Sequence, residues 1–299
     1  MSSFYIIGNG FDLHHNMKTD YKHYKEFLVN NYINICNDYE KCNYLHLNSN
    51  TNIWSDVEKE LKLTCDDCLE SKSDLYPNIS DELTPGWNNI EIALESELKF
   101  FKPFVVDCFN EWISQINISD TRLFPEINNE NYYLSFNYTE TLEKLYNILG
   151  NRILHIHGKC GEELVFGCPY NNEEEIYEAL VREYNDDEWY SLVYEPAIIK
   201  IYNCYKVASK KLKNQYLVLS KFIKNMKQRE CLESVIVMGH SFNGVDMPYY
   251  EDIIIPLLKN ENWVFYAYGK TNEELDQTEK RIRKFTEENG IYRFNIQEW

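Results

Sequence analysis

The sequence has no apolar run approaching the roughly 18 residues that are needed to cross a bilayer. It also lacks the basic start and the cleavage site of a secretory signal peptide. From these absences we expect a chain without membrane association, located in the cytoplasm. Its 299 residues, 44% of them hydrophobic, suffice for one large α/β domain or for a domain with a sizeable insertion.

Basic residues are scarce relative to acidic ones. The chain has 30 Lys and Arg against 48 Asp and Glu, a net charge of −18. Because binding to the phosphates of nucleic acid needs concentrated positive charge, we expect no stable binding to nucleic acid. One basic cluster, Lys206 to Lys213, continues through Lys221, Lys224, Lys227 and Arg229. Its helical spacing predicts an exposed basic stripe, first as a solvated helix face and second as a docking patch.

Clustered cysteines are missing as well. The nine cysteines are scattered singly, which predicts reduced thiols and not a disulfide framework. Cys65 and Cys68 form the one close pair, without a second pair or a histidine at zinc-finger spacing. We therefore interpret them as neighbours on a helix surface.

The stretch from Phe4 to His15, FYIIGNGFDLHH, is the most informative part of the chain. An apolar run ends at Gly8 and Gly10, and helical spacing follows as far as Leu28, which predicts strand, tight turn and helix. Two residues without Cβ allow the backbone to approach a ligand, and a helix N-terminus favours anions. The full dinucleotide-binding motif has a third glycine at the position of Leu13. A close-packed turn between strand and helix, with no ligand, therefore remains an alternative.

Strand and helix patterns alternate again after a helical stretch. One long helix is predicted from about Trp87 to Ile116, and a helical insertion spans 30–125. The β-rich runs predict strands, and the βαβαβ rhythm of the last third predicts a doubly wound, mostly parallel Rossmann-like α/β domain made of 1–29 and 126–299. These runs are 132–136, 153–157, 234–238, 264–268 and 291–296.

Polar residues follow several of these strands. Asn137 follows the second, His157 ends the third, and Ser241 follows the late strand in a glycine-containing turn. In an open α/β sheet the carboxyl ends of the strands lie along one edge, so these side chains should meet there. His155 lies one step deeper and is interpreted as a hydrogen-bonded supporting residue. Asp246 precedes a helix and is well placed as its N-cap.

Four separated motifs carry a resemblance to a known family. They are GNGFDLxH with TxY, WSDVE, SFNYTETLE followed by ILHIHGK, and MGHSFNGVDMPYY. In this order they resemble the AbiH family of bacteriophage abortive-infection proteins. Asn16 stands where that family usually has a glycine, and asparagine also tolerates left-handed backbone.

The AbiH pattern is in turn distantly similar to Sir2-like NAD-binding domains. That resemblance implies NAD as cofactor, with Asn137 and His157 as catalytic candidates at the reacting ribose and with cleavage of the nicotinamide–ribose bond as the reaction. Thr139 stands where the Sir2-like motif has Asp, which weakens nicotinamide recognition. The candidates for cofactor contact are Gly8, Asn9, Gly10, Asp12, Thr139, Gly239, His240, Ser241 and Asp246.

Other functions stay open at this point. A sensor that binds NAD or a related small-molecule nucleotide without turnover would use the same glycine turns and would not need His157. A metal-dependent phosphodiesterase or nuclease would need converging ligands, and the candidates are Asp12, His14, His155, His157, His240 and Asp246. A pure interaction protein would keep these polar residues as caps and turns. A phage-derived trigger and a homo-oligomer are the remaining expected partners.

Overall fold

A computed structural model describes residues 2–42, 53–54, 56–61, 65–75, 86–170, 178, 193–242, 244–269 and 271–299. Contacts divide the chain into two compact units. The sheet unit comprises Met1–His23, Trp112–Leu164 and Leu212–Trp299, and the helical unit comprises Tyr24–Glu111 and Val165–Lys211. The sequence predicts one domain made of 1–29 and 126–299 and a second made of 30–125. Division by contacts does not measure whether such parts fold independently, so these domain bounds stay a prediction.

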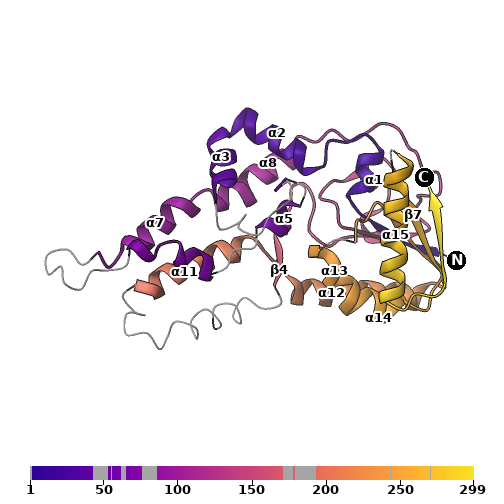
Figure 1. Ribbon diagram of the computed structural model, residues 1–299. Helices are drawn as coiled ribbons and strands as arrows, with labels where there is room; N and C mark the ends of the chain where they lie inside the picture. Colours follow the sequence, from indigo (N-terminus) through magenta and orange to yellow (C-terminus); the bar gives the residue numbers. More distant parts are fainter. Residues whose placement is uncertain are drawn as a thin grey trace. The chain divides into compact units, whose positions relative to one another are not determined.

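Six parallel strands form the sheet of the sheet unit, in the order β3-β2-β1-β6-β7-β8. This confirms the predicted parallel α/β class. The strands are β1 (Ser2–Ile7), β2 (Tyr132–Ser135), β3 (Ile153–His155), β6 (Leu232–Met238), β7 (Trp263–Ala267) and β8 (Phe294–Glu298). Figure 1 shows one of them, β7, beside helix α15 (Asn272–Glu288).

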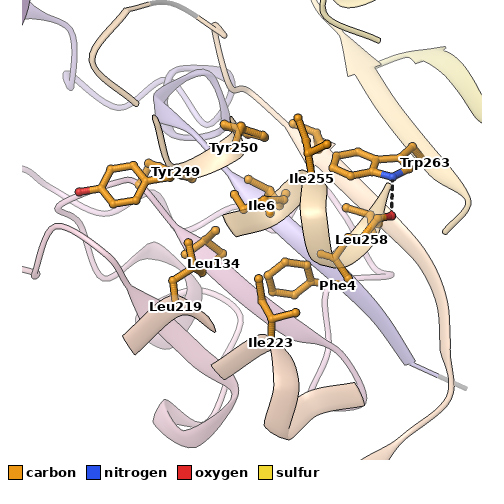
Figure 2. Packing of buried hydrophobic residues seen from close by; sticks show 14 of the residues in the cluster. Phe4, Ile6, Leu134, Leu219, Ile223, Tyr249, Tyr250, Ile255, Leu258 and Trp263 are labelled. Carbon is orange, nitrogen blue, oxygen red and sulfur yellow. Dashed lines mark hydrogen bonds between the residues drawn. The ribbon is translucent and has the colours of Figure 1, made fainter. Parts of the chain in front are cut away.

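Both faces of the central strands β1 and β2 are buried, which is why these strands read as largely apolar runs, whereas the edge strand β8 is mostly exposed. Successive side chains of β1 alternate between the faces. Phe4 and Ile6 belong to one core cluster, and Tyr5 and Ile7 belong to the other. Figure 2 shows the first cluster, in which the Trp263 indole N–H donates to the Leu258 carbonyl at 3.0 Å.

Helices cover each face. On the Phe4 side lie α12 (Leu212–Arg229), α13 (Met247–Tyr249), the π-helical η6 (Tyr250–Ile254), α14 (Ile255–Leu258) and α15 (Asn272–Glu288). On the Tyr5 side lie α1 (Asn9–His14) and α9 (Thr141–Lys144). Two 3-10 turns, η3 (Gly150–Arg152) and η5 (Gly244–Asp246), also belong to this unit.

The prediction of one continuous first helix is wrong, because the helix ends at His14 and a second helix, α2 (Tyr21–Asn31), begins seven residues later. Asn16 has φ +59°, the left-handed conformation expected for it from the sequence. The Met17 N–H bonds to the Asp12 carbonyl at 3.1 Å and the Asn16 N–H to the Leu13 carbonyl at 3.0 Å. This is a Schellman-type end, which satisfies the last carbonyls and stops the helix.

The helical unit contains short helices and a small parallel sheet. The predicted single helix from Trp87 to Ile116 is interrupted at 99–100, because Pro103 has no N–H to bond to the Lys99 carbonyl, and the π-helical η2 begins at that proline. The elements are α3 (Ile33–Lys41), α5 (Val57–Glu60), α6 (Cys65–Glu70), η1 (Ser73–Leu75), α7 (Asn89–Leu98), η2 (Pro103–Cys108), α11 (Glu195–Val207), β4 (Cys168–Tyr170) and β5 (Ser209–Lys211). α2 and α8 (Phe109–Ser114) each extend across a boundary between the units.

β5 overturns part of the predicted exposed basic stripe. Lys210 has no exposed side-chain surface, and its Nζ lies 2.7 Å from Oε2 of Glu58. The Gly167 N–H also donates to this carboxylate oxygen, at 3.4 Å. The cluster from Lys206 to Lys213 is therefore divided between α11, a buried strand and the start of α12.

Across the ranges that the structure describes, no helix is both long enough and apolar enough to span a bilayer.

Candidate functional site

The sheet order places two turns next to each other at the carboxyl edge. β1 and β6 are neighbours, and the strand order continues from them in opposite directions. Such a switch point is where open α/β sheets bind ligands. The Gly8 N–H donates to the Met238 carbonyl at 2.9 Å, and the Gly10 N–H donates to the Gly239 carbonyl at 2.8 Å. The turn after β1 is thus joined directly to the turn after β6.

Packing alone accounts for the glycines of these turns. A Cβ added to Gly8 would lie 2.6 Å from the His240 Cα, and one added to Gly10 would lie 2.7 Å from the Gly239 Cα. Gly239 also has φ +72°. Since the Gly10 N–H is already bonded within the protein, phosphate contact by Gly8, Gly10 and Gly239 stays a prediction. Asn9 uses its amide to donate to the Thr19 carbonyl at 3.0 Å.

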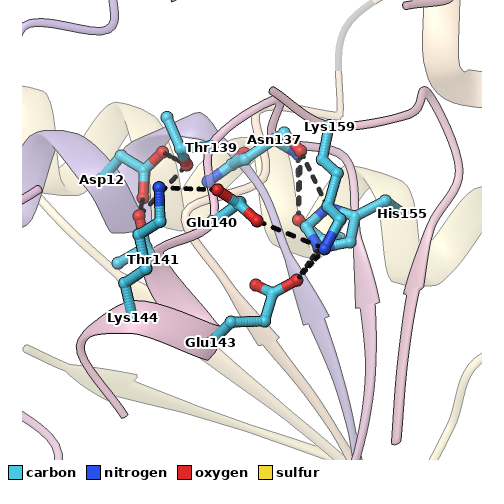
Figure 3. A network of polar contacts seen from close by, with 10 residues as sticks. Asp12, Asn137, Thr139, Glu140, Thr141, Glu143, Lys144, His155 and Lys159 are labelled. Carbon is cyan, nitrogen blue, oxygen red and sulfur yellow. Dashed lines mark hydrogen bonds and ion pairs between the residues drawn. The ribbon is translucent and has the colours of Figure 1, made fainter. Parts of the chain in front are cut away.

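Asp12 is fully buried beside this corner. It accepts hydrogen bonds from the Thr139 hydroxyl and, at 2.8 Å, from the Thr141 hydroxyl (Figure 3). Burial raises the pKa of Asp12 to about 6, against the opposing effect of its bonds to Thr139, Thr141 and Asn137. Thr139, which is predicted to contact the cofactor, therefore also binds the carboxylate of Asp12 in α1.

Asn137 lies at the junction of the two glycine turns, which we call the glycine corner, and its catalytic role stays a prediction. Its Nδ2 donates to the Gly8 carbonyl at 3.2 Å, and its backbone N–H donates to the Ser135 hydroxyl at 3.2 Å. Its Oδ1 is buried and, within the part of the chain that the structure describes, accepts no hydrogen bond. An unsatisfied buried acceptor costs about 1–3 kcal/mol, so this oxygen is a natural contact for a donor on a ligand.

His155 occupies the supporting position that the sequence predicted. Its Nδ1 lies 3.3 Å from the Asn137 carbonyl and its Nε2 lies 3.0 Å from Oε1 of Glu143 (Figure 3). Lys159 bonds to the same Glu143 oxygen at 3.0 Å. Burial would raise the pKa of Glu143, but His155 and Lys159 outweigh it and lower that pKa to about 2. This network anchors the segment that carries Asn137.

A second cluster joins His157, Asp246 and His240. Nε2 of His157 lies 3.3 Å from Oδ1 of Asp246, and Nε2 of His240 lies 3.7 Å from Oδ2. Asp246 occupies the predicted N-cap position of α13, but its side chain makes no capping hydrogen bond and lies beside the two imidazoles instead. The Phe242 N–H donates to Nδ1 of His240 at 3.1 Å, which assigns the proton of the neutral ring to Nε2, on the Asp246 side.

Aromatic rings enclose the His157 imidazole. β3 ends at His155, so His157 lies beyond the strand, and its side chain is only 2% exposed. The rings of Phe136, Tyr138 and Tyr249 lie within 6.0 Å of it, centroid to centroid. Asp246, 19% exposed, lies beside it and reaches the surface. Ser241 is exposed. Asp12, Asn137 and Thr139 thus lie in one cluster and His157, His240 and Asp246 in a second, while Asn9 and Ser241 belong to neither.

The six side chains considered as metal ligands do not all meet: His157, His240 and Asp246 lie together, and the other three lie elsewhere. Among the residues that the structure describes, no group of three or more His, Cys, Asp and Glu side chains is arranged to hold a metal ion. His14 stacks on Trp299 at 4.7 Å between ring centroids, Asp12 is held by threonines and His155 by Glu143.

Sequence reasoning missed Tyr250, whose hydroxyl is buried and has no hydrogen-bond partner among the described residues. Its ring stacks on Phe136 at 6.1 Å and meets His240 edge-on at 5.0 Å. Burial, with the Asp246 charge, raises the pKa of this phenol well above its usual value. Tyr250 lies in the motif MPYY, but a tyrosine at helical spacing is expected in a hydrophobic core. Nothing in the sequence therefore marked it as a residue of the candidate site.

Comparison with known proteins gives one result that bears on identity. No curated protein and no solved structure matches the chain significantly. The family model described as "Bacteriophage abortive infection AbiH" matches residues 4–268, which is most of the chain. The matched range contains both clusters of the candidate site, and the chain belongs to the AbiH family.

Proposed function

We propose that this chain binds NAD or a related nucleotide at the carboxyl edge of its sheet and hydrolyses the bond between nicotinamide and ribose. Membership of the AbiH family supports a role in abortive infection, an antiphage defence. Consumption of a central nucleotide is a chemistry that suits such a role. The proposal names Asn137 and His157 as catalytic residues.

The observation that carries this proposal is the buried Oδ1 of Asn137. Its amide nitrogen is fixed by the Gly8 carbonyl, so the oxygen points elsewhere and, among the described residues, has no donor. A ribose hydroxyl or the carboxamide N–H of nicotinamide would supply that donor. The position fits a nucleotide, because it adjoins the β1/β6 switch point.

The reaction consumes water and yields nicotinamide and ADP-ribose. The carbon–nitrogen bond breaks with its electron pair leaving on nicotinamide, while the water oxygen bonds to the anomeric carbon and the water proton goes to a base. His157 is the candidate base, and Asp246, 3.3 Å from its Nε2, would orient the ring and stabilise its protonated form. The enclosing aromatic rings would keep other water away.

Release of nicotinamide from NAD by the purified protein, with and without phage lysate as activator, tests the proposal. Asn137→Ala and His157→Ala should each lower turnover by about 100-fold or more, as is typical for loss of a general base or a polarising group. The matched controls are Asn117→Ala and His23→Ala, which remove the same side-chain types outside the two clusters. Unchanged turnover in both site variants would contradict the assignment.

A nucleotide sensor without turnover is the second candidate, and the burial of His157 favours it. A sensor needs the Asn137 contact but no accessible base. It would show an increase in melting temperature with NAD or ADP-ribose, lost in Asn137→Ala and kept in His157→Ala, with no nicotinamide formed.

A further inference from the structure

The outer face of α12 is basic and exposed along its whole length. Leu212, Leu219, Ile223 and Met226 turn inward and are buried. The helix contains no acidic residue. Its exposed side chains include Lys213, Leu217, Val218, Lys221, Lys224 and Arg229, which we call the basic face of α12. Leu217 is 68% exposed and Val218 51% exposed, so two aliphatic side chains lie uncovered among the cations.

The positive charge of this face is not neutralised locally. Lys227, at its edge, pairs with Glu261 at 2.7 Å. Within the described part of the chain, Lys213, Lys221, Lys224 and Arg229 form no ion pair. In a protein with a net charge of −18, such a face is the natural contact for an acidic surface.

The sheet unit itself carries an acidic surface at the start of α15. Glu273, Glu274 and Asp276 are exposed there, and the first basic residue of the helix is Lys280. Lys280 pairs with Asp276 at 2.6 Å, but both side chains are largely exposed, so the Asp276 carboxylate stays accessible next to the first-turn charges of Glu273 and Glu274.

Both helices cover the same face of one sheet. Leu219 and Ile223 of α12 share a core cluster with Ile282 and Phe285 of α15. A two-fold axis brings the same face of two copies together. If α12 of the first copy contacts α15 of the second, then α12 of the second copy also contacts α15 of the first. The two helices therefore form a self-complementary pair of charged surfaces.

We propose that the basic face of α12 binds the acidic start of α15 in a second copy of this chain, and the reverse, to form a two-fold symmetric dimer. The contact would cover Leu217 and Val218 and join the cations to Glu273, Glu274 and Asp276. The proposal does not depend on the nucleotide site.

Mass measurement by light scattering of the full chain tests it. In about 0.1 M salt the mass should be about twice the 35.8 kDa of one chain. In about 1 M salt it should fall toward the single-chain value, because the screening length drops from about 10 Å to about 3 Å. A single-chain mass at low salt, or a dimer indifferent to salt, would overturn the proposal.

A charge exchange gives the sharper test. Lys221→Glu/Lys224→Glu and Glu273→Lys/Asp276→Lys should each be monomeric, because each leaves two like-charged faces. Mixed in equal amounts, the two variants should form a dimer again, because the acidic α12 of one meets the basic α15 of the other. Lys18→Glu/Lys102→Glu, which reverses the same charges at exposed positions elsewhere, should stay dimeric. Failure of the mixture to associate while each variant keeps its helical circular dichroism would refute the pairing.

Discussion

At the scale of single residues, Asp12 is the clearest source of pH dependence. Its folded-state pKa is about 6, against an ordinary value of 3.8, mainly because of burial. The native state therefore holds a proton more tightly than the unfolded state. The stability from this group is fully present below about pH 3.8 and is lost as the pH rises through about 6.

Asp12→Asn should flatten this part of the pH profile. In the wild type, the free energy of unfolding should fall by up to about 3 kcal/mol from this group as the pH rises across the window. Urea denaturation at a series of pH values measures it. The exposed Asp120→Asn is the control and should keep the wild-type profile. An unchanged slope in Asp12→Asn would show that another group titrates there.

Residue types at the site were readable from the sequence, but their side-chain partners were not. Asn137 was expected at the glycine corner and bonds to Gly8 there. Asp246 was expected to cap a helix, yet it faces two imidazoles from other segments. Asp12 bonds to a threonine 127 positions away. The rules for helix caps and turns concern residues that are close in sequence. They cannot predict which distant residue a side chain will contact in the fold.

At the scale of elements, the two glycine turns hold β1 and β6 together, and among Gly8, Gly10 and Gly239 the last is the least replaceable. A Cβ there would lie 2.1 Å from the Phe11 nitrogen and 2.6 Å from the Gly10 carbonyl carbon, both backbone atoms. We expect Gly239→Ala to cost about 3 kcal/mol or more, because left-handed strain and overpacking act together.

Gly150→Ala is the matched control for that measurement. An added Cβ at Gly150 meets nothing within 4 Å, so the free energy of unfolding should change by less than about 1 kcal/mol. Guanidinium denaturation of both variants gives the comparison. Equal, small effects would mean that the two turns can separate without loss of stability.

In the helical unit, the buried pair of Lys210 and Glu58 connects β5 to α5. Lys210→Met leaves a buried carboxylate without its cation, which costs about 3–5 kcal/mol. The double variant Lys210→Met/Glu58→Gln should recover much of this loss. Lys200→Met removes a partly exposed lysine 3.2 Å from Glu95 and should cost about 1 kcal/mol or less. Equal losses in the two single variants would contradict a special role for burial.

Periodicity located the elements better than their ends and surroundings. α15 covers Asn272–Glu288, as the sequence predicts, and the β-rich runs coincide with β1, β2, β6 and β7. The predicted long helices failed where Asn16 and Pro103 change the backbone. Lys210 was misread because lysine is almost always exposed, and the distant Glu58 that pairs with it makes its burial tolerable.

At the scale of the whole molecule, the alternation of strands and helices predicted the parallel sheet because connections between parallel strands are right-handed and short. The strand order brings Gly8 and Gly239 together although 230 positions separate them, and the sequence predicted that meeting from the fold class. It did not predict that the two turns would bond to each other and occupy the Gly10 N–H, because backbone pairing leaves no mark in residue type.

The overall charge leads to the last prediction, which concerns nucleic acid. With 48 acidic and 30 basic residues, long-range repulsion should prevent the chain from binding a labelled DNA duplex at about 0.15 M salt, as measured by fluorescence anisotropy. Lys221→Glu/Lys224→Glu should behave in the same way as the wild type. Binding that weakens steeply with salt and is lost in this variant would instead make the basic face of α12 a phosphate-binding surface. DNA and the acidic start of α15 in a second copy would then compete for the same face of α12.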